Sequence, residues 1–209
     1  MEPLELDDLL PLEEFAARRR EFFLAHARYL DRHRRVRLGP CVTLVFENRQ
    51  TLWFRLQEVI RIARLTEPTR LRQELAHYNR LLPRSGCLQA ALLLEIDETK
   101  LAAELARWRD LHGDQLTLHL GSTLIPADLL TSRPEDRAIG TAHWVQFALD
   151  EENKCRLMDR RFAAGFRISM PGYVHESGAL GDDVRESLAS DLGGVPMGAT
   201  DASRRAKSV

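Results

Sequence analysis

The hydrophobic pattern is clearest between residues 42 and 65, where a short strand leads through a polar hinge into an amphipathic helix. In residues 42–46, Val42, Leu44 and Phe46 point to one face and Thr43 and Val45 to the other, as the period of two of a strand requires. After the hinge, large apolar residues recur at helical spacing: Leu52, Leu56, Val59, Ile60 and Ala63. This spacing predicts one buried stripe packed against a sheet. Asn48 stands where an N-cap residue is expected.

The same reasoning predicts the other elements of the chain. Helices are expected at 12–34, from 71 to about 79, over 100–111 with Thr99 as cap, from a cap at Asp150 to about 161, and at 182–192. Strands are expected at 88–96, 115–121, 142–149 and 164–170. Residues 125–137 contain two prolines and are expected to form a polar loop.

These elements predict an α+β fold. Strands separated by helices could indicate a parallel sheet, but residues 115–121 and 142–149 alternate polar with apolar positions. We therefore expect a mixed or mainly antiparallel sheet of about four or five strands, with helices packed mainly on one face. Residues 1–192 are expected to form a single domain. Residues 193–209 lack periodicity and are expected to form a disordered tail.

Composition excludes several classes of protein. The 209 residues are 44% hydrophobic, which suits a normal core, and the net charge of -1 provides no overall field for nucleic acid or membranes. No apolar run approaches the roughly 20 residues of a membrane helix. The acidic start of the chain lacks the basic region of a secretory signal, so a cytoplasmic location is expected. The three cysteines are far apart and predict no disulfide framework.

The polar hinge is the candidate for a binding site. Acidic, basic and amide side chains gather there beside an apolar strand and an apolar helix, as they would around a ligand or partner. Solvated turn residues are the alternative interpretation of the same pattern. Glu58 is expected to pair with an arginine, either Arg61 or Arg49. The candidate ligand- or partner-binding residues are Glu47, Asn48, Arg49, Gln57, Glu58, Arg61, Tyr78 and Asn79.

A basic cluster follows the first predicted helix and consists of Arg32, His33, Arg34, Arg35 and Arg37. Cations at a helix C-terminus are favourably placed by the helix dipole. The alternative is contact with nucleic acid. Because no aromatic residues interleave with these arginines as stacking platforms, the first interpretation is favoured.

No motif of a known catalytic class is present, so no catalytic residue is assigned. The sequence contains no nucleophile elbow, P-loop, Rossmann glycine pattern or zincin helix. His119 and His143 could meet if their strands paired, but no third ligand is spaced to complete a metal site. We therefore predict neither a metal nor a cofactor.

Several segments together resemble a bacterial family known as domain of unknown function 3501 (DUF3501). The resemblance spans most of residues 9–173 and is strongest in RRVRLGP, LVFENRQT, LQEVIR, YNRLLP and AALLLEI. It implies an accessory protein associated with rubrerythrin-like and iron–sulfur oxidoreductase proteins. Many relatives carry a histidine before the last proline, whereas Met170 precedes Pro171 here. This departure argues against a histidine site at that end of the chain.

Three functions are therefore expected, in decreasing order. The first is a non-catalytic accessory or binding protein of a bacterial redox system, with a rubrerythrin-like or iron–sulfur protein as partner. The second is an enzyme or small-ligand-binding protein with a polar pocket at the hinge. The third is nucleic-acid binding through residues 32–37.

Overall fold

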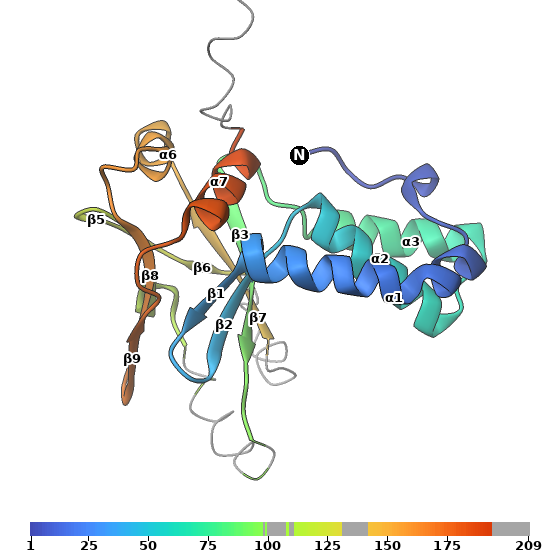
Figure 1. Cartoon of the computed structure of the whole chain (residues 1–209), viewed down its shortest axis with the longest axis horizontal. Helices are drawn as coiled ribbons and strands as arrows, with labels where there is room; N and C mark the ends of the chain where they lie inside the picture. The colour runs from blue at the N-terminus through green and yellow to red at the C-terminus, as the bar shows by residue number, and fades with distance from the viewer. Residues whose placement is uncertain (98, 100–107, 109–110, 131–141, 194–209) are drawn as a thin grey trace, which may run out of the picture.

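A helical arm projects from a body of two β-sheets (Figure 1). The arm consists of α1 (Leu12–Tyr29), α2 (Arg49–Ala63) and α3 (Pro68–Asn79). This computed structural model describes residues 1–97, 99, 108, 111–130 and 142–193. The helix expected at 100–111 lies largely outside these residues, as does the expected tail after Gly193. In the described part of the chain, no helix has the length and apolar character needed to span a membrane.

The body contains two antiparallel sheets. The first has the order β1-β2-β3-β7-β6 and the second has the order β5-β4-β8-β9. The strands of the first are β1 (Arg35–Leu38), β2 (Val42–Phe46), β3 (Cys87–Leu94), β7 (Ala142–Ala148) and β6 (Asp128–Leu129). Those of the second are β5 (Thr123–Pro126), β4 (Leu116–Leu120), β8 (Ala164–Met170) and β9 (Tyr173–Glu176).

The predicted α+β class and antiparallel pairing are confirmed, although the strands divide between two sheets. The sequence pattern missed β1, β5, β6 and β9, which have four residues or fewer. The expectation of a polar loop from residue 125 is therefore wrong at its start, where β5 ends and β6 follows. Strands this short contain too few alternating positions to be recognised by periodicity. The first helix was expected to reach Arg34. In the structure α1 ends at Tyr29, a π-helical turn continues it over Leu30–Arg34, and β1 follows directly.

The main core lies between the two sheets. Phe46 from the first sheet and Phe166 from the second have ring centroids 5.2 Å apart, and Phe147 lies at the same distance from Phe166. On β7 the alternate residues His143, Val145 and Phe147 are all buried. This core holds the body together independently of the arm.

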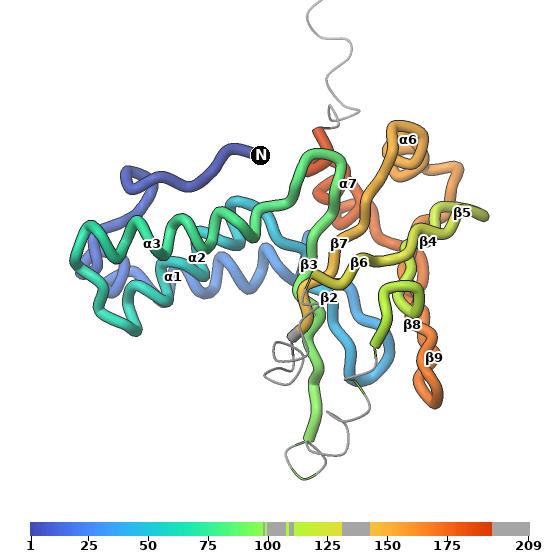
Figure 2. Tube along the Cα trace, turned by 180° about the vertical axis from the view of Figure 1, so that it is seen from behind, coloured from blue at the N-terminus to red at the C-terminus, as the bar shows by residue number. Residues whose placement is uncertain are grey.

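The arm contains a second apolar cluster. Leu52, Leu56 and Ile60 of α2 pack with Leu75 of α3 and with Leu4 of the N-terminal segment. The expectation that this stripe packs against the sheet is wrong, because α2 leaves the sheet and buries its apolar face within the arm (Figure 2). Val59, expected in the same stripe, is only half-buried.

Two further helices of the described residues belong to the body. α6 (Glu151–Met158) begins at Asp150, whose side chain accepts a hydrogen bond from the backbone of Asn153, as predicted for its N-cap. α7 (Asp182–Asp191) carries the buried residue Arg185, whose guanidinium donates to backbone carbonyls at the end of α6 and just after it. Because these carbonyls have no further helical partner, Arg185 fixes α7 against α6.

Candidate functional site

Glu47 is a fully buried charged residue at the hinge between β2 and α2. The Thr51 hydroxyl donates a hydrogen bond to one carboxylate oxygen at 2.5 Å. Nη2 of Arg55 lies 2.7 Å from the other oxygen, in an ion pair whose angles do not form a good hydrogen bond. Burial raises the pKa of Glu47, and the nearby Arg55 charge and Thr51 hydroxyl oppose that rise. The hinge therefore holds a buried carboxylate whose charge is compensated first by Arg55 and to a smaller extent by Arg34.

Aromatic side chains surround Arg55. Its guanidinium lies 5.5 Å from the centre of the Trp144 ring, a cation–π distance. Tyr78 is half-buried, and burial raises its pKa while the Arg55 charge opposes the rise. His26 of α1 has a pKa lowered to about 4, first by burial and then by the charges of Arg55 and Arg35. The imidazole is therefore neutral at physiological pH.

Asn48 joins the hinge to a second buried ion pair. Its side-chain oxygen accepts from the Thr51 backbone at 3.0 Å, which confirms the predicted N-cap. Its amide nitrogen donates to the Tyr29 hydroxyl at 2.8 Å, and Nε of Arg34 donates to the same hydroxyl at 3.0 Å. Arg34 in turn pairs with Asp191 at the end of α7, and both side chains are almost fully buried. This network connects the arm to the body.

Glu58 bridges two helices of the arm. Its carboxylate accepts from Nε of Arg19 on α1 at 2.9 Å and from Nη2 of Arg61 at 3.0 Å. The predicted pair between Glu58 and Arg61 is confirmed, and Arg19 is a further partner that the sequence analysis missed. Burial raises the pKa of Glu58, but the two arginines outweigh burial and the net direction is downward. Glu58 therefore holds α1 against α2.

Arg49 and Asn79 hold the N-terminal segment. Arg49 pairs with Asp8 at 2.5 Å, so the alternative pairing of Arg49 with Glu58 is wrong. The Asn79 side chain accepts from the Leu4 backbone N–H at 2.8 Å and donates to the Leu4 carbonyl at 2.9 Å. Both residues thus contact a segment that the sequence analysis did not connect with the hinge.

Gln57 is the candidate residue without polar partners. Its side chain is 1% exposed, and neither the amide oxygen nor the amide nitrogen has a hydrogen-bond partner among the described residues. Helical spacing places it on the same face as Trp53 and Arg61, one turn away from each. A buried amide without partners costs about 1–3 kcal/mol. Gln57 therefore adds no polar contact to the hinge.

The eight candidate residues thus divide among several places. Glu47, Asn48 and Tyr78 lie at the junction of arm and body, Glu58 and Arg61 lie between α1 and α2, and Arg49 and Asn79 contact the N-terminal segment. Gln57 is buried on α2 without a polar partner among the described residues. An open hollow of about 490 Å³ lies beside the hinge. It is lined by Met1, Asp8, Asn48, Arg49, Gln50 and Trp53.

The basic cluster 32–37 is largely compensated by carboxylates. Arg34 pairs with Asp191, Arg32 with Asp183 of α7 at 2.8 Å, and Arg35 with Asp31. Arg37 lies 3.9 Å from Glu95. Each of these four arginines therefore faces a carboxylate, and among these pairs the one between Arg34 and Asp191 is buried.

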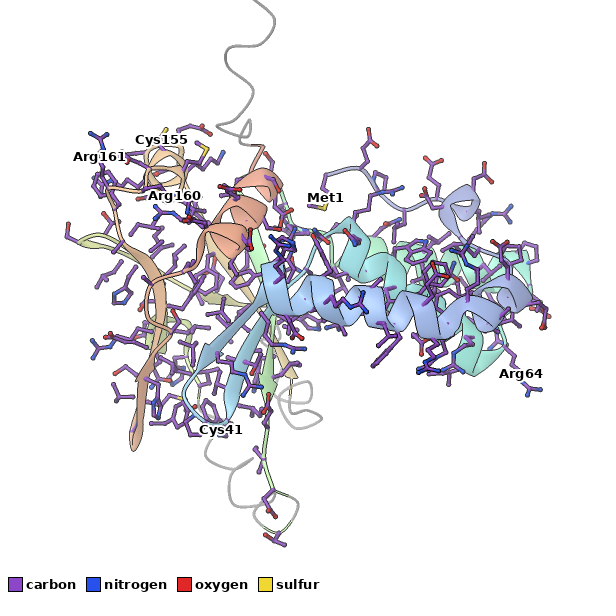
Figure 3. All side chains as sticks on the ribbon, in the orientation of Figure 1. Met1, Cys41, Arg64, Cys155, Arg160 and Arg161 are labelled. Atoms are coloured by element: carbon purple, nitrogen blue, oxygen red, sulfur yellow. The ribbon has the colours of Figure 1, made fainter. Side chains whose placement is uncertain are left out.

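The histidine and cysteine candidates for metal binding are dispersed. His119 lies on β4 and His143 on β7, which belong to different sheets, so the pairing considered for these strands does not occur. Within the described ranges, no three residues among His, Cys, Asp and Glu are grouped as metal ligands. Cys41 and Cys155 lie at opposite ends of the body (Figure 3), and they and Cys87 are free thiols.

The partners that complete these clusters lie outside the stretches that local spacing connects. Arg19, Arg55 and Asp191 each pair with a residue at least eight positions away in the chain. The sequence contained one signal of such a buried pair, which was Glu47 itself. A charged residue that directly follows an apolar strand is expected to be buried with a partner. The identity of that partner had no local signal.

Comparisons with known proteins agree with this fold. The family model of DUF3501, described as a protein of unknown function, matches residues 3–192. A crystal structure from Burkholderia pseudomallei K96243, described as a novel protein of unknown function, is similar with a TM-score of 0.82 and 27% sequence identity. The similarity covers 91% of this chain and 100% of that chain. No curated protein matches the chain significantly.

Proposed function

Because the chain belongs to DUF3501, a family described only as a protein of unknown function, we propose its function from the geometry of the arm. The protein is a non-catalytic binding protein that contacts an acidic protein partner through the outer face of α1 and α2. The partner class expected from the family resemblance is a redox protein, either rubrerythrin-like or an iron–sulfur oxidoreductase. The observation that carries the proposal is a surface of exposed apolar and cationic side chains on these two helices.

The apolar part of this surface comes from both helices. Phe23 and Leu24 of α1 are 48% and 42% exposed, and Ile62 of α2 is 70% exposed. Phe23 lies over the joint between the helices, with its ring centroid 6.5 Å from that of Phe54. Ile62 follows Glu58 by one turn and so lies on the α2 face that Arg19 bridges to α1. Large apolar side chains exposed together are typical of protein interaction surfaces.

The cationic part of the surface is free to pair with a partner. Arg20 and Arg28 are exposed on α1, and neither forms an ion pair with a described carboxylate. Arg20 lies one turn from Phe23 and Leu24, on the same helical face. Arg64 projects from the far end of the arm (Figure 3). Arginine beside aromatic residues is enriched at interface centres, and its charge favours an acidic partner.

The hinge supports the alternative, a small-ligand site, less well. Its polar groups pair within the chain: Glu47 with Arg55, Arg49 with Asp8, and Asn48 with the start of α2. A ligand would have to displace these contacts before it bound. The same reasoning applies to nucleic-acid binding through residues 32–37, whose charges are mostly paired.

The test is direct binding to purified candidate partners. The rubrerythrin-like and iron–sulfur oxidoreductase proteins of the same host are titrated against the chain by calorimetry, under reducing and oxidising conditions. Phe23→Glu and Arg20→Glu should weaken binding by about tenfold or more, the scale of an interface hot spot. Leu124→Glu and Val174→Glu are matched controls, because these residues are 59% and 54% exposed but lie on the second sheet.

Two outcomes would contradict the proposal. Absence of binding to both proteins under every condition would contradict the proposed redox partner. An equal loss of affinity in the arm variants and in the control variants would contradict the assignment of the interface to the arm.

A further inference from the structure

The N-terminal segment, residues 1–11, lies along α2 and α3 as a peptide would lie on its receptor (Figure 2). We name this segment the strap. We name the residues of α2 and α3 that hold it, which include Arg49, Trp53 and Asn79, the strap surface. Leu4 is the strap residue most deeply inserted, at 3% exposed, among the leucines of the arm core. Leu6 and Leu9 pack against the same cluster at partial exposure.

Asn79 recognises the backbone of the strap. Its one side chain bonds both the N–H and the carbonyl of Leu4, at 2.8 and 2.9 Å. An amide carries a donor and an acceptor side by side, so it can hold an extended chain whatever the side chain at that position. In peptide recognition, main-chain hydrogen bonds commonly provide affinity and a side-chain pocket provides specificity.

A second anchor holds the strap four residues later. Nε1 of Trp53 donates to the Asp8 carbonyl at 2.9 Å, and Nη2 of Arg49 pairs with the Asp8 carboxylate at 2.5 Å. The hydrogen bond from Arg49 lowers the pKa of Asp8. The strap surface therefore selects a leucine and, four positions on, a carboxylate.

The strap leaves room beside it on this surface. Residues 1–3, 5 and 7 are exposed, so the strap is held mainly at Leu4 and Asp8. A hollow of about 420 Å³ lies next to Leu4 and is lined by Glu5, Leu6, Asp7, Arg72, Leu75, Ala76 and Asn79. Arg72 has no ion pair with a described carboxylate, so this hollow offers a further cation to an acidic ligand.

We propose that the strap surface is a binding site for an acidic, leucine-containing linear segment of another protein, which the strap occupies within its own chain. An incoming segment with leucine and aspartate at the same spacing competes with the strap for Asn79, Trp53 and Arg49. The site lies on α2 and α3 and is separate from the outer α1–α2 face proposed above. This proposal therefore does not depend on the proposed α1–α2 interface.

The test uses a labelled peptide with the sequence of residues 1–11, MEPLELDDLLP, and the full-length chain. Leu4→Glu in the chain releases the strap by placing a charge in the apolar cluster. Asp8→Arg releases it by opposing Arg49, without disturbing the core, and serves if Leu4→Glu lowers the helical content. By fluorescence anisotropy, either released chain should bind the peptide at least about tenfold more tightly than the wild type does.

Asn79→Ala, added to either released chain, should abolish this gain, and a peptide with glutamate at the Leu4 position should not bind. Intact circular dichroism of the released chain confirms that the fold is retained. A folded released chain that binds no more peptide than the wild type would overturn the proposal. Binding that is insensitive to Asn79→Ala would overturn it as well.

Discussion

Arg55 places its guanidinium 2.7 Å from the fully buried carboxylate of Glu47, although Arg55 itself is one-third exposed. The pair joins the end of β2, which Glu47 directly follows, to the second turn of α2. Because the carboxylate has lost its water, its charge is stabilised mainly by Arg55, and then by the Thr51 hydroxyl and the Arg34 charge.

Arg55→Leu is expected to lower the free energy of unfolding by about 1–3 kcal/mol. Removing one partner of a buried ion pair costs about 3–5 kcal/mol, and the partial exposure of Arg55 reduces that value through solvent screening. Adding Glu47→Gln should recover part of the loss, because the neutral side chain no longer needs a cation. Urea unfolding of both single variants and the double variant measures this coupling. Strictly additive losses would show that the two residues do not interact.

The His26 imidazole is expected to make the protein less stable as pH falls from 6.5 to about 4. Its pKa is lowered from 6.5 to about 4 in the fold, so in this window the unfolded chain binds the proton and the folded chain does not. The full shift corresponds to about 3 kcal/mol, which partial exposure reduces to about 1–2 kcal/mol.

His26→Phe tests this origin, since phenylalanine can keep the stacking on Phe54, whose ring centroid lies 4.1 Å from that of His26. The variant should lose stability less steeply than the wild type between pH 6.5 and 4. Thermal unfolding at a series of pH values provides the comparison. Parallel curves for the two proteins would assign the acid sensitivity to other groups.

Glu58→Gln is expected to lower the free energy of unfolding by about 1 kcal/mol. Glu58 is 17% exposed and pairs with an arginine on each of two helices, whereas a fully exposed pair contributes about 0–1 kcal/mol. Arg19→Leu should cost more than Arg61→Leu, because only Arg19 connects α1 to α2. Glu21→Gln is the control, since its pair with Arg18 lies on the exposed side of α1. Equal effects of Glu58→Gln and Glu21→Gln would reduce Glu58 to surface charge.

Leu56→Ala is expected to cost about 2–5 kcal/mol, the range for truncating a buried leucine. Leu56 is fully buried in the arm cluster. Ile62→Ala, one helix turn and a half further on, should change stability by no more than about 0.5 kcal/mol because Ile62 is exposed. Chemical denaturation of both variants decides whether the arm cluster stabilises the fold. A loss well under 1 kcal/mol for Leu56→Ala would show that the arm unfolds separately from the measured transition.

The sequence alone predicted the elements whose cause is local. Asn48 caps α2 because its side chain reaches a backbone N–H three residues on, and Asp150 caps α6 in the same way. The pair between Glu58 and Arg61 was likewise predictable from a spacing of three residues on one helix. Strands β2 and β7 were predictable because side chains that alternate between two faces over five or more residues indicate a strand.

Only the tertiary structure decided where those elements face and which charges meet. The apolar stripe of α2 required burial, but periodicity contains no information about whether a sheet, α3 or the strap supplies the covering surface. Likewise Glu47 required a cation, and the chain offered many arginines. Arg55 became its partner, and Arg34 the partner of Asp191, because packing in three dimensions brings them together across the hinge. Local spacing thus determines helices, caps and near pairs, whereas long-range contacts depend on the whole fold.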